Sequence, residues 1–306
     1  MNLNNRRSFL KNLGLLSAAA SLSPLVPFDA FSAEKNAFFE ISLAEWSFHK
    51  ALFGKKMTNL EFPRKAKKDF GINIVEYVSP FFDKKESDQA YLKELLSITK
   101  GEGIQNHLIM VDGEGMLGDL NEKARHEAVE KHHKWVHAAK FLGCKTIRVN
   151  AAGNGTAAEV KTAVVDGLGK LAEYGKQYKI NIIVENHGGH SSDGSWLADV
   201  MKQVNNPYCG TLPDFGNFRI SKDKEYDKYQ GVKDLLPYAK GISAKTFDFD
   251  AQGNEETIDY DRMFKIIRDG KWSGIVGIEY EGNKLSEEEG IRKTVDLLRK
   301  IQKQYA

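Results

Sequence analysis

Short apolar runs alternate along the chain with longer stretches in which apolar residues recur every three or four positions. The short runs are rich in β-branched and aromatic residues, which favours buried strands, whereas the longer stretches have the period of amphipathic helices. The expected strands lie at residues 38–48, 72–80, 104–111, 144–150, 180–186, 209–215, 241–249 and 274–282. Clear helical stretches between them cover residues 88–103, 124–143 and 159–178. Glycines that suit helix C-caps precede several strands, as at Gly71, Gly103 and Gly143.

Eight strand candidates that recur about every 30–40 residues match the unit length and size of a (β/α)8 barrel. A doubly wound sheet is the structural alternative, but it usually has fewer strands. No linker, low-complexity segment or change of composition divides the chain after its N-terminus. We therefore predict a single TIM barrel domain over residues 34–306.

The N-terminus has a different composition. Residues 4–11, "NNRRSFLK", precede a modest apolar stretch that ends in small residues. A charged segment, a short apolar region and a small-residue cleavage site are typical of a secretory signal. The paired Arg6 and Arg7 followed by Phe-Leu-Lys after Ser8 predict a twin-arginine signal over residues 1–33, with cleavage near Ser32 or Ala33. The mature protein is then expected in the periplasm.

The composition of the 306-residue chain excludes several classes of function. The 44 basic and 42 acidic residues are interspersed, and the formal net charge is +2, so nothing indicates a nucleic-acid partner. No apolar run reaches the ~20 residues of a membrane-spanning helix. The two cysteines, Cys144 and Cys209, exclude a disulfide framework. A single bridge is conceivable, but buried free thiols are expected. A homo-oligomer is compatible with these features.

Polar and ionisable side chains follow nearly every expected strand. In a barrel of this kind the C-terminal strand ends carry the chemistry, so these residues are candidates for a functional site. They are Trp46, Phe48, His49, Glu76, Asp112, Glu114, Arg148, Asn150, Glu185, His187, Asp214, Asn217, Lys245, Asp248, Glu279 and Glu281.

Glu185, Asp214 and Glu279 each come at the end of an apolar run and are expected to point into the barrel mouth. Three carboxylates converging there would repel one another, and two would hold protons unless a cation lay between them. Oxygen ligands of this kind suit Mg²⁺ or Mn²⁺, with Co²⁺ or Zn²⁺ as alternatives. The alternative interpretation is that individual acids cap helices or pair with Arg148 and Lys245.

Four segments in order give the chain its resemblance to the xylose isomerase-like TIM barrel superfamily of sugar isomerases and epimerases. They are "VENHGG", "GTLPDFGN", "ISAKTFDFD" and "GIEYEG". The resemblance implies that Glu185, Asp214 and Glu279 bind one divalent ion and that the two glutamates also act as the acid/base pair. Where the family has a histidine as the remaining ligand, this chain has Ser243, and a further family histidine is replaced by Asn217. His187, Asn217 or water would then complete the coordination.

The family mechanism implies proton transfer at a sugar carbon beside a carbonyl. One glutamate removes the proton and the other returns it, while Lys245 stabilises the developing oxyanion. His187 and His190 are candidates for binding hydroxyls or moving protons. Trp46 and Phe48 are candidates for packing on the apolar face of the sugar. Further substrate-binding candidates are His49, Arg148, Asn150 and Asn217.

Other motifs carry less weight. Gly153–Ala158 fits a dinucleotide fingerprint, but it lies in mid-chain without the acidic residue that such a fold places ~20 residues later. His133 and His137 have zinc-ligand spacing, but they lie on an expected outer helix among lysines.

The leading functional hypothesis is a metal-dependent isomerase or epimerase of a ketose or keto-sugar. A close variant uses the same proton abstraction for β-elimination from a 3-keto-glycoside. A metal-independent glycoside hydrolase and a non-catalytic sugar-binding barrel are the alternatives from other classes.

Overall fold

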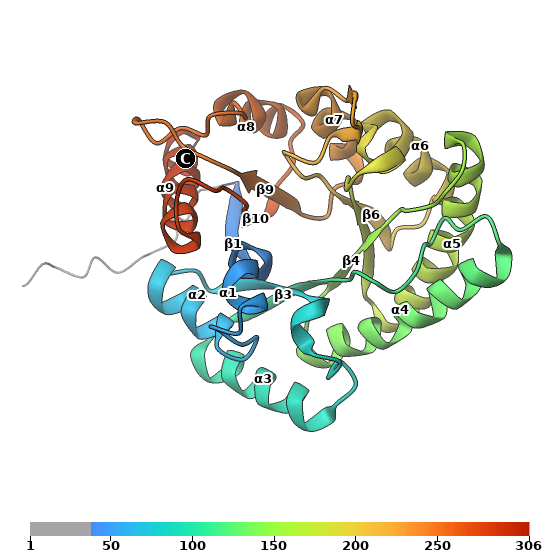
Figure 1. Ribbon diagram of the computed structural model, residues 1–306, viewed down its shortest axis with the longest axis horizontal. Helices are drawn as coiled ribbons and strands as arrows, with labels where there is room; N and C mark the ends of the chain where they lie inside the picture. Colours follow the sequence, from blue (N-terminus) through green and yellow to red (C-terminus); the bar gives the residue numbers. More distant parts are fainter. Residues whose placement is uncertain (1–37, 306) are drawn as a thin grey trace, which may run out of the picture. The chain divides into compact units, whose positions relative to one another are not determined.

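A computed structural model describes residues 38–305, which form a barrel of parallel strands enclosed by helices (Figure 1). The strands pair in the order β6-β5-β4-β3-β2-β1-β10-β9. Isolated bridges from Thr211 to Ala239 and from Asp214 to Ser243 connect the β6 segment to the β9 segment and so bring the two edges together. The predicted (β/α)8 fold is confirmed. The barrel strands are β1 Phe39–Ala44, β2 Ile74–Val78, β3 Gln105–Met110, β4 Thr146–Asn150, β5 Asn181–Glu185, β6 Cys209–Leu212, β9 Ile242–Thr246 and β10 Gly274–Tyr280.

Helices follow the strands and cover the outside of the barrel (Figure 1). Their ends follow from local sequence: Thr156 and Ser286 form capping boxes at the starts of α5 and α9. Gly71, Gly103 and Gly143 adopt the left-handed conformation at the ends of α2, α3 and α4, as their positions predict. The helices are α1 His49–Phe53, α2 Phe62–Phe70, α3 Gln89–Glu102, α4 Glu122–Leu142, α5 Ala157–Tyr178, α6 Gly194–Val204, α7 Lys228–Leu235, α8 Tyr260–Asp269 and α9 Glu287–Gln304.

Shorter elements complete the loops. The polar segment after β6 contains a two-stranded hairpin, β7 Arg219–Ser221 and β8 Lys224–Glu225, which pair antiparallel. Single 3-10 turns are η1 Glu45–Phe48, η2 Ser79–Phe82, η3 Gly189–Ser192 and η4 Leu236–Tyr238. Among the described helices, none combines the length and the apolar character that crossing a bilayer requires.

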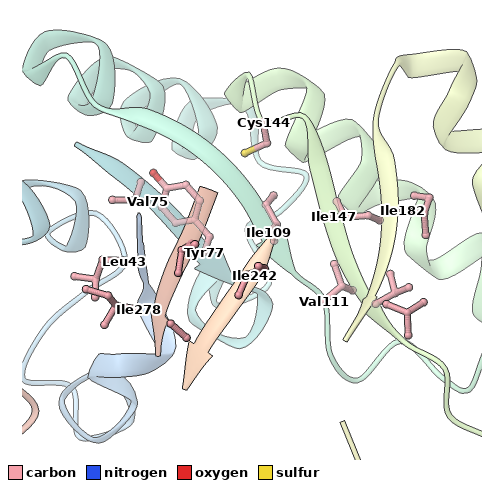
Figure 2. Packing of buried hydrophobic residues seen from close by; sticks show 14 of the residues in the cluster. Leu43, Val75, Tyr77, Ile109, Val111, Cys144, Ile147, Ile182, Ile242 and Ile278 are labelled. Atoms are coloured by element: carbon pink, nitrogen blue, oxygen red, sulfur yellow. The ribbon is translucent and has the colours of Figure 1, made fainter. Parts of the chain in front are cut away.

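The core has two layers because successive strand side chains point to opposite faces. Outward-facing residues such as Val75, Ile109 and Ile182 pack between the strands and the helices (Figure 2). A smaller apolar cluster fills the inside of the barrel: Ala44, Val78, Leu108, Met110, Ile183 and Leu212. The inward positions at the C-terminal ends of several strands are instead polar, which places ionisable groups on top of this cluster.

The structure confirms some of the expectations drawn from the sequence and contradicts one. Phe48 does not face the mouth: it is 1% exposed and packs against Phe62 and Phe70, so its expected contact with a sugar was wrong. Cys144 and Cys209 are free thiols, as expected. His133 lies on α4, where its ring stacks on Tyr174, consistent with an outer helical position. The predicted signal peptide, its cleavage site and the domain boundary at residue 33 lie outside the described residues.

Candidate active site

Three carboxylates from separate strands meet at the C-terminal end of the barrel. Glu185 ends β5, Asp214 follows β6 and Glu279 lies near the end of β10. Each offers an oxygen, and the three oxygens lie within 4.8 Å of one another. The residues are only 1%, 0% and 4% exposed, respectively. The structure thus brings together the three acids that the strand ends predict; they are called the acidic cluster below.

Glu185 is held by an amide and a guanidinium group. Its Oε1 accepts a hydrogen bond of 2.9 Å from Asn217 Nδ2. Its Oε2 lies 2.8 Å from Arg148 Nε, an ion pair in which the N–H is not aligned for a hydrogen bond. Arg148 Nη1 also donates to Asp112 Oδ1 at 2.7 Å, as does Asn150 Nδ2. Of the predicted substrate-binding residues, Arg148 and Asn217 therefore contact Glu185 directly, whereas Asn150 contacts Asp112.

Ser243 bridges the other two acids. Its Oγ lies 2.7 Å from Asp214 Oδ2 and 3.2 Å from Glu279 Oε2. A hydroxyl has one proton, so it can donate to only one of the two carboxylates at a time. Asp214 Oδ1 meanwhile accepts backbone N–H bonds of 2.8 Å from Gly216 and Asn217. The serine therefore orients two acids at the position where the family resemblance implies a histidine ligand.

Lys245 is the cation nearest to the acidic cluster. It is 1% exposed, and its Nζ lies 2.5 Å from Glu279 Oε1, 2.9 Å from Glu281 Oε2 and 3.8 Å from Asp214 Oδ2. Glu281 Oε1 also accepts a hydrogen bond from the indole N–H of Trp46. From the sequence, Glu281 was predicted only as one of the strand-end acids. Its two-residue spacing from Glu279, which puts both side chains on one strand face, was the signal for a larger role.

Burial and like charge raise the pKa values of two acids in the cluster, Glu185 and Asp214. The pKa values of Glu185 and Asp214 are raised to about 7, mainly by burial; Arg148 opposes the shift at Glu185, and Lys245 opposes it at Asp214. Two cations, Arg148 and Lys245, face five carboxyl groups: the acidic cluster with Asp112 and Glu281. The excess of acids and the all-oxygen donor set fit a divalent metal ion, which Glu185, Asp214 and Glu279 would hold.

A further carboxyl group lies beneath the acidic cluster. Glu76 on β2 is 1% exposed, and Ser42 Oγ donates to its Oε1 at 2.5 Å. A Cβ atom at Gly277 of β10 would lie 2.6 Å from the same oxygen, so glycine leaves the room that Glu76 occupies. Burial raises the pKa of Glu76 to about 8, against the opposing hydrogen bond from Ser42, with Glu279 and Glu185 adding to the rise. Burial therefore favours the protonated form of Glu76 near neutral pH.

Glu76 predicts a pH dependence of stability. Unfolding releases its proton above the ordinary pKa of 4.5, whereas the folded protein keeps it until about pH 8. As the pH rises from 4.5 to about 8, the free energy of unfolding should therefore decrease, by up to about 1.4 kcal/mol per pH unit from this group. Glu76→Gln should remove that slope and leave the variant relatively more stable at pH 8 than at pH 5. Urea unfolding of both proteins at pH 5, 6.5 and 8 measures the difference; parallel profiles would contradict it.

Aromatic side chains form one wall of the mouth. Trp46 and Phe81 pack on the apolar cluster inside the barrel, and their rings are stacked at 6.2 Å. His49 stacks on Trp46 at 5.0 Å, and its Nδ1 is 2.8 Å from the Trp46 carbonyl oxygen, so it supports the tryptophan; the same nitrogen lies 3.9 Å from Glu287 Oε1. Phe53 packs edge-on against both Trp46 and Phe81 and is 60% exposed. These four residues are called the aromatic wall.

The histidines after β5 lie on the loop that follows Glu185. The His187 side chain is exposed, and within residues 38–305 no hydrogen bond or ion pair joins it to the acidic cluster. His190 Nε2 lies 3.1 Å from the carbonyl oxygen of Gly155 and its ring packs near Trp196. A ligand role for His187 stays a prediction, whereas Asn217 contacts Glu185 directly.

Solved structures share this fold at low sequence identity. The IolI protein with a bound zinc atom aligns with a TM-score of 0.69 and 16% identity over 87% of this chain and 99% of its own. A D-tagatose 3-epimerase-like protein gives 0.67 and 13% over 87% and 98%. The 3-keto-D-glucoside 4-epimerase YcjR from E. coli, in its apo form, gives 0.62 and 15% over 86% and 99%.

Sequence comparison identifies the family. No curated protein matches the chain. The sequence model of the xylose isomerase-like TIM barrel family, in contrast, matches residues 64–301, which run from α2 into α9. The chain therefore belongs to the xylose isomerase-like TIM barrel family.

Proposed function

We propose that the protein is a metal-dependent sugar isomerase or epimerase that moves a proton at the carbon beside a carbonyl of a ketose or keto-sugar. The observation that carries this proposal is the acidic cluster. Glu185, Asp214 and Glu279 are buried with their oxygens within 4.8 Å of one another, although like charges at this distance repel. A divalent cation bound there would remove the repulsion and polarise the carbonyl and hydroxyl oxygens of the sugar.

The residues of the chain supply the proton transfers. Glu185 and Glu279 come from β5 and β10, so they approach the mouth from different strands. One carboxylate accepts the proton from the carbon, and the other, as the acid, returns a proton to form the product. The pKa of Glu185, raised to about 7 chiefly by burial, suits a group that must change protonation state near neutral pH. Lys245 donates to the oxygen on which negative charge develops.

Other side chains around the mouth suit the rest of a sugar. Trp46 presents an aromatic ring for C–H groups, and Arg148 and Asn217 offer N–H donors for hydroxyl oxygens. Solved proteins with this fold include the epimerases named above, which supports the class of substrate. On the strength of the predicted twin-arginine signal, we propose that the reaction takes place in the periplasm.

A direct test combines metal analysis with isotope exchange. Purified protein should contain about one divalent metal ion per chain and should incorporate solvent deuterium into at least one sugar from a panel of ketoses and 3-keto-glycosides. Chelation should abolish the exchange, and Mn²⁺ or Mg²⁺ should restore it. Full activity after complete metal removal would favour a glycoside hydrolase, and absence of both metal and exchange would favour a binding protein.

The aromatic wall favours a second candidate, cleavage or epimerisation of a 3-keto-glycoside. Phe53 extends the wall outward from Trp46, and its 60% exposure leaves apolar surface beyond the place of the reacting sugar. Exposed apolar surface that continues from a site is typical of a binding groove. A glycoside would place its second ring there, whereas a free ketose has none.

Substitution of Phe53 distinguishes these substrates. Phe53→Ala should raise KM about fivefold for a 3-keto-glycoside and leave KM for a free ketose unchanged, because only the longer substrate reaches the ring. Leu120→Ala is the matched control, since Leu120 is another exposed large apolar residue, on the loop after β3. Steady-state kinetics on paired substrates gives the answer. Equal effects on both substrates would remove the argument for a second-ring site.

A further inference from the structure

Glu281 joins the aromatic wall to the lysine of the site. It follows β10 two residues after Glu279, and its side chain is 28% exposed. One oxygen accepts from the indole N–H of Trp46, and the other accepts from Lys245 Nζ at 2.9 Å. A single carboxylate therefore contacts both a wall residue and the cation beside the acidic cluster.

Lys245 has a hydrogen-bond donor to spare. An ammonium group carries three N–H bonds. Two of them are directed to Glu279 Oε1 and Glu281 Oε2. Asp214 Oδ2, at 3.8 Å, is too far for a third hydrogen bond, and the described residues provide no other acceptor. Two fixed acceptors restrict how the ammonium can rotate and so define where its third N–H points.

Trp46 is fixed by the same carboxylate. Its ring stacks on the rings of His49 and Phe81, which sets its plane, but stacking alone permits sliding within that plane. The hydrogen bond to Glu281 removes this freedom because it fixes the indole N–H at one point. The position of the wall and the orientation of the lysine are therefore set together.

We propose that Glu281 is a positioning residue that holds the Lys245 ammonium with its third N–H directed at the substrate oxygen while it anchors Trp46 against the sugar. The proposal rests on the proposed function in that it assumes a sugar oxygen as the acceptor. The other part of the proposal, that Glu281 positions the Lys245 ammonium, does not depend on the reaction.

The test compares Glu281→Gln with a matched control. Glu114 makes the same pair of contacts elsewhere: Oε1 accepts from Trp135 Nε1 at 2.8 Å and lies 2.9 Å from Lys134 Nζ. Glu281→Gln should lower kcat about 10- to 100-fold, because a misdirected donor loses most of its effect on the transition state. Glu114→Gln should leave kcat and KM unchanged.

Trp46→Phe separates the two contacts, since it keeps an aromatic ring and removes the N–H. This variant should mainly raise KM, with a smaller loss of kcat. The double variant Trp46→Phe/Glu281→Gln should lose no more kcat than Glu281→Gln alone, because both changes act through one carboxylate. Additive losses in kcat would overturn the proposed coupling.

Crystal structures supply a readout that needs no turnover. In Glu281→Gln the Lys245 ammonium should leave its position beside Glu279, and the Trp46 ring should shift or show two conformers. An unmoved Lys245 together with unchanged kcat would overturn the proposal. If the wild type turned over no sugar but Lys245 moved in the variant, the positioning role would stand and the proposed function would fail.

Discussion

Glu185→Gln and Glu279→Gln are each expected to lower kcat about 10³-fold, within the range that positioned acid–base groups contribute. Glutamine keeps the size of the side chain but cannot accept a proton from carbon. In Glu185→Gln the hydrogen bond from Asn217 to the side-chain oxygen can persist, so the fold should be retained, and the variant is assayed with saturating Mn²⁺ because the metal loses one of its three carboxylate ligands. Steady-state turnover, with thermal unfolding to verify the fold, measures it.

Isotope exchange sharpens this prediction. If the two glutamates act on opposite faces of the carbon, each variant retains one base. Glu185→Gln should then still exchange solvent deuterium into one epimer and Glu279→Gln into the other, while neither interconverts the two. Glu114→Gln, which removes a carboxylate outside the acidic cluster, is the control. Loss of exchange from both epimers in one variant, with full exchange in the other, would indicate a single base. Wild-type turnover in both variants would contradict the mechanism.

Lys245→Met is expected to lower the free energy of unfolding by about 3–5 kcal/mol in metal-free protein. The ammonium is fully buried beside Glu279 and Glu281, and its removal leaves carboxylates without their nearest cation. Lys161→Met is the matched control, because Lys161 pairs with Asp199 at 2.7 Å at the surface and should contribute less than about 1 kcal/mol.

Metal binding should restore part of the free energy of unfolding that Lys245→Met loses. A divalent cation that binds only the folded state adds about 2.7 kcal/mol at a concentration 100 times its Kd. Lys245→Met leaves the acidic cluster with one positive charge fewer, so Mn²⁺ should bind it more tightly and stabilise it more than the wild type. Urea unfolding with and without Mn²⁺ measures both effects. Equal stabilisation of the two proteins would place the metal away from the cluster, and an unchanged stability of metal-free Lys245→Met would contradict the electrostatic argument.

The sequence was most informative about features that depend on residues close together in the chain. Apolar periodicity, glycine caps and the regular alternation of strands and helices predicted the barrel and its eight strands, because each depends on residues close together in the chain. The polar ends of the strands predicted that Glu185, Asp214 and Glu279 converge. This followed from a general property of parallel barrels, which align the C-terminal ends of all strands.

The direction in which a side chain points, and the residues that it contacts, were harder to predict. Phe48 lies close to Trp46 in sequence, yet the 3-10 turn after β1 directs Phe48 into the outer core and Trp46 toward the mouth. Glu281 was one strand-end acid among many until the fold brought Trp46, 235 positions away, to its carboxylate. His187 follows Glu185 closely in sequence, but its side chain is exposed and its role as a ligand stays a prediction.

The sequence by itself therefore determined the family fold, the three acids and their need for a counter-charge, because alternation along strands and electrostatic repulsion act on any chain with this pattern. Only the tertiary structure decided which groups neutralise and orient those acids. The contacts of Ser243 with Asp214 and Glu279, of Arg148 with Glu185, and of Glu281 with Lys245 and Trp46 join different strands and loops. Their geometry depends on the closure of the barrel, which brings together residues that no local pattern relates.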